Sequence, residues 1–593
     1  MYHVTLNGQG FVLDLSDKDG YSRRLFDPFA SKLGGGQRSY TDLKGTEQAI
    51  SLSDWSGGEG QAQHDLLGPN RYRAAEGIDA YTERGTIRLG PDAPQRVNTA
   101  ANEVSALGIY NGHLMIGLQG GTVFRWDGVN PAVVVGVCAG SVRSIESMLG
   151  VCYFGVEGSG QVSSCTTAWA FTAAKFTVAG SVGVYALRTF YRQSVQYLYV
   201  GSSASGAGGV AAIHWYDGVT LSPVQYDPEE VFVLAAEVLG NRLYFLASDI
   251  SAPRLGIYSV DDQGGGGVYR CHVRVPGAYC WGAAVYQGTL YLLLGPNGRI
   301  ATWDGTTLTE IYRVGTPAAP YPSTMYGIAE WQGALWIGFQ DSAGTQGLLR
   351  FDGASWSRPV LGIPGVAIRK LHPYAGQLAV ASQATGASKT YLTSTSFRTT
   401  GTLETSLLDT GVPSEPKVLR EVTMVHSSLT SGQSVQIQYR LEDTGSWTTL
   451  GTSSGLGSTV VTFTFPISTV CRQLGLRLVL GGPGGASTPV LHEVLVRYGL
   501  LPVARREWVV TVVLEGTATA PLKRLDGTDE PLTGKGLSDA LWAARDSQHA
   551  VIFSDLDDAS RRVWIEDIDE RPGKLTQRNG YQARARVRLV EAS

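Results

Sequence analysis

Short apolar strands separated by glycine-containing turns recur along most of this chain. Between about residues 100 and 395, one phrase repeats: an apolar strand, an aromatic residue, a polar-Gly turn, and a second strand rich in Leu and Tyr. The clearest copies are Leu107–Gly117, Ala284–Leu294 and Ile328–Gly338. Asn-Gly and Gln-Gly supply the positive φ values that tight hairpins require, and alternating apolar residues suit half-buried strands. The pattern therefore predicts a series of β-hairpins.

The hairpins recur with a nearly constant period. The turn glycines Gly240, Gly288, Gly333 and Gly376 lie 48, 45 and 43 residues apart. An aromatic-Asp-Gly triplet follows several copies, at Trp126-Asp127-Gly128, Tyr216-Asp217-Gly218, Trp303-Asp304-Gly305 and Phe351-Asp352-Gly353. Two hairpins in about 45 residues make a four-stranded antiparallel blade, and blades arranged radially make a propeller. Seven copies predict a β-propeller of about seven blades over residues 96–395. A pair of ordinary β-sandwiches is the alternative.

The flanking segments predict further β-rich domains, which makes the expected fold class all-β. Residues 1–95 carry short strands between glycine clusters and are predicted to form an N-terminal β-rich docking domain. Residues 396–500 alternate apolar and polar positions between turn clusters, which favours a β-sandwich. Residues 501–593 predict a C-terminal β-rich domain with one short helix at Ser538–Arg545, for which Ser538 is the expected N-cap.

Composition and charge narrow the function classes. Hydrophobic residues make up 43% of the 593 residues, so a large core can be buried, and the formal net charge of −4 offers no global attraction to nucleic acid or anionic lipid. No apolar run approaches the roughly 18 residues of a membrane span, and the first residues lack signal-peptide features. We therefore expect no nucleic-acid partner, no membrane insertion and no secretion. The six cysteines contain no CxxC pair and are expected to be buried, reduced thiols.

A search for chemistry finds no established catalytic motif. P-loop, GxGxxG, GxSxG and HExxH patterns are absent, and the nine histidines are scattered. The carboxylate clusters at Asp261-Asp262, Glu229-Glu230 and Asp555–Asp558 adjoin turn residues, so they are interpreted as solvated turns. The sequence therefore predicts no catalytic residue, no cofactor and no metal site, and we expect a protein that is not an enzyme.

Basic residues near the C-terminus form the candidate subunit interface. Arg584, Arg586 and Arg588 alternate with Ala and Val, which places the three side chains on one face of a strand. One interpretation is a charged edge strand that resists edge-to-edge aggregation. The other is a surface for an acidic partner subunit.

Several segments resemble a known family. The stretches Leu474–Leu480, Ser487–Leu491 and Val494–Tyr498 resemble the β-sandwich segment of minor tail proteins of long-tailed bacteriophages, and so do Leu541-Trp542, Val551–Asp555 and Val563–Ile568. Gly57–Gln61 and Arg73–Asp79 are similar to the entry region of such proteins. The resemblance implies a virion structural protein of the tail or tail tip that assembles in the host cytoplasm and contributes to host attachment. The implied partners are other tail proteins, further copies of this chain in the virion, and a host surface receptor.

Two other functions compete with this one: a bacterial glycan-binding or glycan-cleaving propeller, and a cytoplasmic propeller scaffold. The missing signal peptide argues against the glycan protein, because its substrates lie outside the cell. For a tail protein, we expect the two flanks to dock to other subunits while the propeller faces outward, since a propeller closes on itself and leaves only short protected edges.

Overall fold

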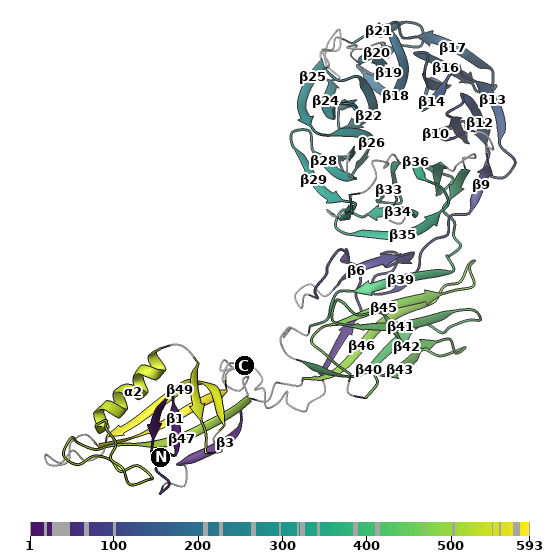
Figure 1. The fold of residues 1–593 in the computed structure, drawn as a ribbon. Helices are drawn as coiled ribbons and strands as arrows, with labels where there is room; N and C mark the ends of the chain where they lie inside the picture. Colours follow the sequence, from purple (N-terminus) through teal and green to yellow (C-terminus); the bar gives the residue numbers. More distant parts are fainter. Residues whose placement is uncertain are drawn as a thin grey trace.

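The computed structural model consists of a propeller, a β-sandwich and a smaller domain that contains both ends of the chain (Figure 1). The structure describes the residues 2–16, 20–26, 48–64, 70–98, 102–204, 211–224, 229–261, 269–295, 298–316, 319–320, 327–340, 344–383, 389–409, 416–467, 469–500, 505–547, 550–556, 559–572 and 582–591.

The propeller has seven four-stranded antiparallel blades, as the repeated hairpins predict. Blade 1 consists of β10(Val104–Tyr110), β11(His113–Leu118), β12(Thr122–Trp126) and β13(Val133–Val137). Blade 2 consists of β14(Ser141–Met148), β15(Val151–Glu157), β16(Gln161–Thr166) and β17(Phe171–Thr177). Blade 3 consists of β18(Ser181–Arg192), β19(Val195–Ala204), β20(Ala212–Tyr216) and β21(Leu221–Pro223). Blades 4 and 5 are β22(Phe232–Leu239), β23(Arg242–Asp249), β24(Arg254–Asp261) and β25(Tyr269–Pro276), then β26(Tyr279–Tyr286), β27(Thr289–Gly295), β28(Arg299–Trp303) and β29(Leu308–Arg313). Blade 6 is β32(Ile328–Trp331), β33(Ala334–Gln340), β34(Gln346–Phe351) and β35(Trp356–Ile363), after the small hairpin β30(Gly315–Thr316) and β31(Ala319–Pro320).

Blade 7 closes the ring with a strand from the other end of the propeller sequence. It consists of β36(Ala367–Tyr374), β37(Gln377–Gln383), β38(Lys389–Leu392) and β9(Gln95–Asn98). Strand β9 pairs antiparallel with β38, with Thr390 opposite Val97. The chain therefore enters and leaves the propeller at the same blade.

The turns that define the repeat have the backbone that the sequence predicts. Gln287 and Gly288 have φ values of 48° and 71°, the two positive values of a type I′ hairpin turn. In the aromatic-Asp-Gly turns the aspartate organises the backbone: one carboxylate oxygen of Asp304 accepts the N–H groups of Thr306 and Thr307 at 2.8 and 2.7 Å. The equivalent aspartates Asp127, Asp217 and Asp352 make the same pair of contacts.

Tyrosines at the ends of inner strands join neighbouring blades. The Tyr286 hydroxyl, at the end of β26, donates to the carbonyl oxygen of Gly333 in the next blade at 2.9 Å. The Tyr110 hydroxyl donates to Gly150 in the same way at 2.6 Å. These bonds link the inner hairpin of one blade to the inner hairpin of the next and stiffen the ring.

The β-sandwich takes strands from both flanks, so the division predicted for residues 1–95 and 396–500 is wrong. One sheet is ordered β42(Thr448–Ser453), β41(Ser434–Leu441), β45(Leu474–Gly481), β39(Thr400–Thr405), β6(Arg71–Glu76), β5(Gly58–Glu59). The other is ordered β43(Val460–Thr464), β40(Lys417–His426), β46(Val490–Leu500), β8(Ile87–Leu89), β7(Ile78–Asp79), with β4(Gln48–Leu52) beside β46 and β44(Val470–Cys471) beside β40. A single buried core mixes side chains from both segments, among them Trp55, Ile87, Leu403 and Leu478.

The rest of the N-terminal segment belongs to the terminal domain, the name used here for residues 2–26 together with residues 505–591. Its sheet is ordered β2(Gln9–Phe11), β1(Val4–Leu6), β48(Val551–Ser554), β49(Ser560–Pro572), β50(Gln582–Glu591), β47(Arg505–Glu515), β3(Tyr21–Phe26). Helix α2(Gly534–Asp546) packs Leu537 and Leu541 into the core of this sheet. Residues 1–95 therefore do not form a domain of their own, because their strands need partners from residues 397–591.

Helix α2 begins earlier than predicted. Its N-cap is Thr533, whose hydroxyl accepts the N–H of Gly536 at 3.2 Å, whereas Ser538 lies inside the helix and donates to Glu570. No helix among the described residues has the length and apolar character needed to span a membrane.

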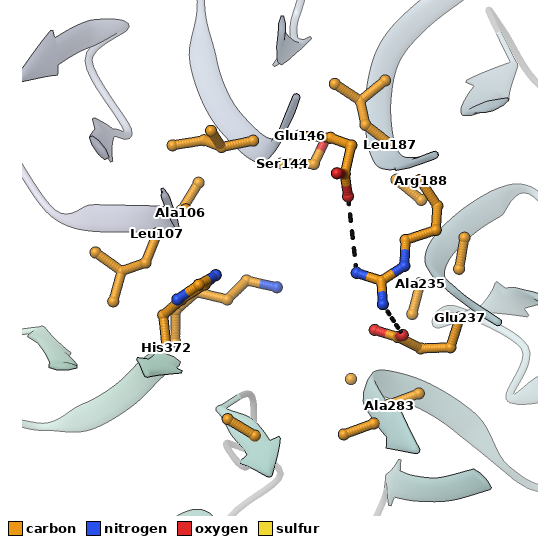
Figure 2. Close-up of a pocket in the computed structure, with 18 of the residues that line it drawn as sticks. Ala106, Leu107, Ser144, Glu146, Leu187, Arg188, Ala235, Glu237, Ala283 and His372 are labelled. Carbon is orange, nitrogen blue, oxygen red and sulfur yellow. Dashed lines mark ion pairs between the residues drawn. The ribbon is translucent and has the colours of Figure 1, made fainter. Parts of the chain in front are cut away.

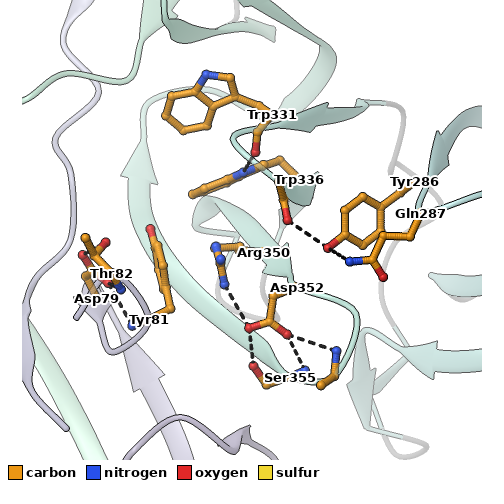
Figure 3. Close-up of polar contacts among 12 residues, drawn as sticks. Asp79, Tyr81, Thr82, Tyr286, Gln287, Trp331, Trp336, Arg350, Asp352 and Ser355 are labelled. Carbon is orange, nitrogen blue, oxygen red and sulfur yellow. Dashed lines mark hydrogen bonds and ion pairs between the residues drawn. The ribbon is translucent and has the colours of Figure 1, made fainter. Parts of the chain in front are cut away.

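A buried carboxylate joins the sandwich to the propeller. Glu59 of β5 accepts hydrogen bonds from Arg358 of β35 at 2.9 Å and from Tyr312 of β29 at 3.2 Å. Nearby, the Arg350 guanidinium lies 3.7 Å from the ring centre of Tyr81, on the sandwich side of the joint, and bonds to Asp352 (Figure 3). The two domains are therefore joined by specific contacts in addition to their two covalent connections.

Candidate functional site

The inner strands of the seven blades surround a central channel that contains a cavity of about 590 Å³. Figure 2 shows Glu146, Arg188 and Glu237 projecting into this space from neighbouring blades, with His372 across from them. A second cavity of about 310 Å³ continues the channel toward the face where the inner strands begin. Arg143, Tyr185, Leu234 and Lys370 line both cavities, so they mark the boundary between them.

A β-bulge that recurs in six inner strands places side chains in the smaller cavity. In each strand the register shifts by one residue just after a buried apolar position, and the extra residue lines the channel. These bulged residues, the bulge layer, are Ser105, Arg143, Tyr185, Leu234, Trp281 and Arg369. Because the channel lining depends on the bulges, its composition differs from blade to blade while the fold stays regular.

The next layer along the channel is built from small residues with a single exception. This small layer consists of Ala106, Ser144, Ala186, Ala235, Gly282 and Lys370, each directly after a bulge. The small side chains leave open space in the centre of the channel. Lys370 therefore places an ammonium group where the other five blades present almost no side chain.

Two residues further along each strand lies the charged layer, which consists of Gly108, Glu146, Arg188, Glu237, Ala284, Ala329 and His372. The Arg188 guanidinium bridges two carboxylates, at 2.8 Å from Glu237 and 3.7 Å from Glu146. The bridge links blades 2, 3 and 4 across the channel wall (Figure 2). With both carboxylates ionised, two negative charges on one guanidinium leave this group with a net negative charge.

Burial shifts the proton affinity of the channel groups. Burial raises the pKa of Glu237 to about 7 against the opposing effect of Arg188, and it also raises the pKa of Glu146. Burial lowers the pKa of Lys370, with a further contribution from the positive charge of Arg143, and it lowers the pKa of His372. All four shifts favour the neutral form, as expected for groups withdrawn from bulk water.

The smaller cavity is lined by ion pairs that satisfy its charges. Arg143 donates to Glu157 at 2.7 Å, and the Tyr185 hydroxyl donates to the same carboxylate at 2.8 Å. Arg369 lies 3.6 Å from Glu103. Apart from Lys370, which borders both cavities, the charged residues at this end of the channel are paired within the protein.

The arginines proposed as a subunit interface lie on β50, which is a central strand between β49 and β47, so the edge-strand interpretation is wrong. Arg584 pairs with Asp14 at 2.7 Å, and Arg588 bonds to the buried Glu507. Arg586 is exposed and has no ion pair within the described part of the chain. The structure thus places all three on one face, as predicted, but two of them are neutralised by acids of the same chain.

Two carboxylates predicted to lie in solvated turns are buried instead. Glu230 is fully buried and accepts a hydrogen bond from the Tyr258 hydroxyl at 2.6 Å. Asp555 is 2% exposed and accepts one from the Trp508 indole at 2.8 Å. Each carboxylate therefore anchors the strand that carries its donor, which is β24 for Tyr258 and β47 for Trp508. In the described ranges, no group of three or more His, Cys, Asp or Glu residues could hold a metal ion.

The six cysteines are free thiols, as expected, but their burial is not uniform. Cys138, Cys152, Cys165, Cys280 and Cys471 are buried. Cys271 lies in the outer strand of blade 4 and is exposed, which corrects the expectation that all six are core thiols. As the outer strand of its sheet, β25 lies at the rim of the propeller (Figure 1), where side chains can reach water.

Sequence reasoning identified none of the channel residues. Their signal is positional: the second residue before the end of the inner strand is Gly or Ala in three blades, Glu in two and His in one. Glu146, Glu237 and His372 occupy this position, whereas Arg188 lies four residues before the end of the longer strand β18. Aligning the copies on the hairpin turn, rather than on the triplets, therefore brings Glu146, Glu237 and His372 into one ring.

The fold and the channel define an all-β protein in which a seven-bladed propeller is carried on a β-sandwich and a terminal domain. No family model and no curated protein matches the chain. Among solved structures, the WD40 β-propeller domain of Doa1 is similar at 15% identity and a TM-score of 0.39, covering 52% of this chain and 97% of that one. Saccharomyces cerevisiae Sqt1 gives 12% identity, a TM-score of 0.37 and coverage of 52% and 100%. The designed protein Ika8 gives 14%, 0.33 and coverage of 51% and 98%.

Proposed function

We propose that this protein is a structural component of a bacteriophage virion, located in the tail or tail tip. The observation that carries the proposal is the nested order of its domains. The terminal domain contains both chain ends, the β-sandwich is inserted into it, and the propeller is inserted into the sandwich. Figure 1 places the terminal domain and the propeller at opposite ends of the molecule.

This nested domain order suits a protein that attaches through its terminal domain and exposes its propeller at the other end of the molecule. A domain built from the first and last strands of the chain can tolerate an inserted domain, so it can dock to neighbouring tail subunits independently of the propeller. The Glu59–Arg358 contact then supports a propeller held at a defined angle on the sandwich. This geometry suits a tail protein that contributes to host attachment through the propeller.

The terminal domain offers a surface for such docking. Arg586 is exposed on the sheet face that carries Arg584 and Arg588, with Thr511 and Asp569 directly opposite it on the neighbouring strands. An acidic surface on another tail protein, or on a further copy of this chain, would complement Arg586. This face of the sheet therefore remains the candidate interface, and Arg586 is the one of its three arginines whose positive charge is available to a partner.

The test is immunogold labelling of phage particles from cells that carry this gene, with antibodies raised separately against the propeller and the terminal domain. We expect propeller antibodies to label the tail or its tip on intact particles. Terminal-domain antibodies should label only particles that have been partly dissociated. Particles of normal form that neither antibody labels before or after dissociation, with the protein present only in the free fraction, would contradict the proposal.

A further inference from the structure

The wall of the central channel is rich in hydrogen-bonding groups. The inner strands β10, β22, β26, β32 and β36 stand at the end of their sheets, so one edge of each has no neighbouring strand among the described residues. A strand edge presents free backbone N–H and C=O groups, and here these edges face the channel. Groups of this kind bind hydroxyl-bearing molecules well, because each can donate or accept a hydrogen bond.

The larger cavity also contains one cation that is available to a ligand. Of the three cations that line it, Arg143 is paired with Glu157, and Arg188 is paired with Glu146 and Glu237. Lys370 forms no ion pair within the part of the chain that the structure describes. It extends from the small layer, where Ala186, Ala235 and Gly282 leave room beside it.

The groups around Lys370 restrict the charge of a ligand. Its ammonium can neutralise one negative charge, whereas the bridged carboxylates in the charged layer would repel a second. A phosphate dianion is therefore disfavoured. A neutral sugar would leave the desolvated ammonium with the electrostatic attraction of Glu237 but without a directly paired counter-charge. The same carboxylates accept hydrogen bonds readily, which suits the hydroxyl groups of a saccharide.

We propose that the central channel binds a small saccharide that carries one carboxylate, of the uronic acid type. The ligand carboxylate pairs with the Lys370 ammonium, and the ring hydroxyls bond to Glu146, Glu237 and the free strand edges. A cavity of about 590 Å³ lies within the range of about 300–1,000 Å³ found for small-molecule sites. This inference concerns the propeller alone and does not depend on a role in the virion.

The test compares two sugars that differ only in the group that Lys370 recognises. Saturation-transfer NMR and isothermal titration calorimetry on the full chain would use D-galacturonate and D-galactose as probes. We expect galacturonate to bind at least about tenfold more tightly than galactose, the usual consequence of one charge-assisted contact. Equal binding of the two sugars, or no binding of either at about 10 mM, would overturn the proposal.

Two variants make the test specific to the site. Lys370→Gln should lower the affinity for galacturonate by about tenfold and leave that for galactose unchanged. The matched control is Lys175→Gln, which removes an exposed lysine from the outer strand β17 and should change neither affinity. Thermal melting checks that both variants fold, and removal of a desolvated charge should not destabilise the propeller. Undiminished galacturonate binding by folded Lys370→Gln would also overturn the proposal.

Discussion

The Tyr21 hydroxyl donates a 2.7 Å hydrogen bond to the carboxylate of Asp555, 534 residues further along the chain. The Trp508 indole donates to the other oxygen of the same carboxylate at 2.8 Å. Asp555 therefore bonds to both the N-terminal strand β3 and the C-terminal strand β47. The ends of this long chain are held in one domain by a buried polar network as well as by strand pairing.

Loss of this bond should weaken the terminal domain. Tyr21→Phe removes one hydrogen bond and leaves an acceptor with fewer partners, so we expect a loss of about 1–2 kcal/mol in unfolding free energy. Denaturant titration of the parent and the variant measures it. Ser22→Ala, at an exposed position on the same strand, is the control and should be nearly neutral.

The same bond predicts a pH dependence. Burial and the hydrogen bond to Asp555 raise the pKa of Tyr21 to about 12, from 10 in the unfolded chain. A raised pKa in the folded state means that the stabilisation is complete below pH 10 and is lost as the pH rises from 10 to 12. The stability difference between the parent and Tyr21→Phe should therefore shrink over this interval. A constant difference would contradict the role assigned to the phenol.

The arginines of β50 should differ sharply in their contribution to stability. Arg588→Ala deprives the buried Glu507 of its arginine, and we expect a loss of about 2 kcal/mol. Arg586→Ala removes an exposed side chain and should stay within about 0.5 kcal/mol of the parent. Chemical denaturation of both variants checks the contrast. If both losses were equal, the assignment of Arg586 as the charge available to a partner would fail.

Hairpin turns in the propeller should reject branched side chains. A Cβ atom at Gly288 would meet nothing within 4 Å, so the cost of a substitution comes from its φ of 71° alone. Gly288→Val should destabilise the propeller by about 1–3 kcal/mol, while Gly288→Asn should cost less, because Asn tolerates this conformation. Thermal unfolding would measure the series. A smaller loss for Val than for Asn would contradict the turn assignment.

The contact between Glu59 and Arg358 should determine whether the sandwich and the propeller unfold together. Glu59→Ala leaves Arg358 without the carboxylate at a mostly buried position, and we expect a loss of about 3 kcal/mol. Differential scanning calorimetry should then resolve separate transitions for the sandwich and the propeller, where the parent shows one shared transition for these two domains beside that of the terminal domain. Glu330→Ala, at an exposed position on inner strand β32, is the matched control and should leave the shared transition intact. Separate transitions for the sandwich and the propeller in the parent itself would show that the joint does not couple them.

The repeat could be predicted from the sequence because the backbone demands it locally. A type I′ turn needs residues that accept positive φ, and Gln287-Gly288 reveals such a turn without knowledge of its neighbours. The position of Lys370 could not be predicted in this way. It depends on a bulge whose extra residue is visible only when two strands are paired, and on small residues contributed by five other blades.

Non-local pairing also explains the wrong domain boundary. Strands such as β6 and β8 have ordinary strand sequences, but their partners lie more than 300 residues away, in β39 and β46. Sequence proximity groups them with β1 and β3, which pair instead with the C-terminal strands β48 and β47. The burial of Asp555 escapes prediction for a similar reason, because its donors Tyr21 and Trp508 are distant in sequence.

The closure of blade 7 has an evolutionary consequence. Because Tyr391 lies opposite Gln95, the first and last strands of the propeller leave the ring side by side. A recombination event that replaced everything between them would need only two junctions, which lie side by side in space, and would leave both sandwich sheets intact. Related chains can therefore diverge by exchanging the whole propeller as a cassette, so that recognition changes in a single step while the carrier is inherited unchanged.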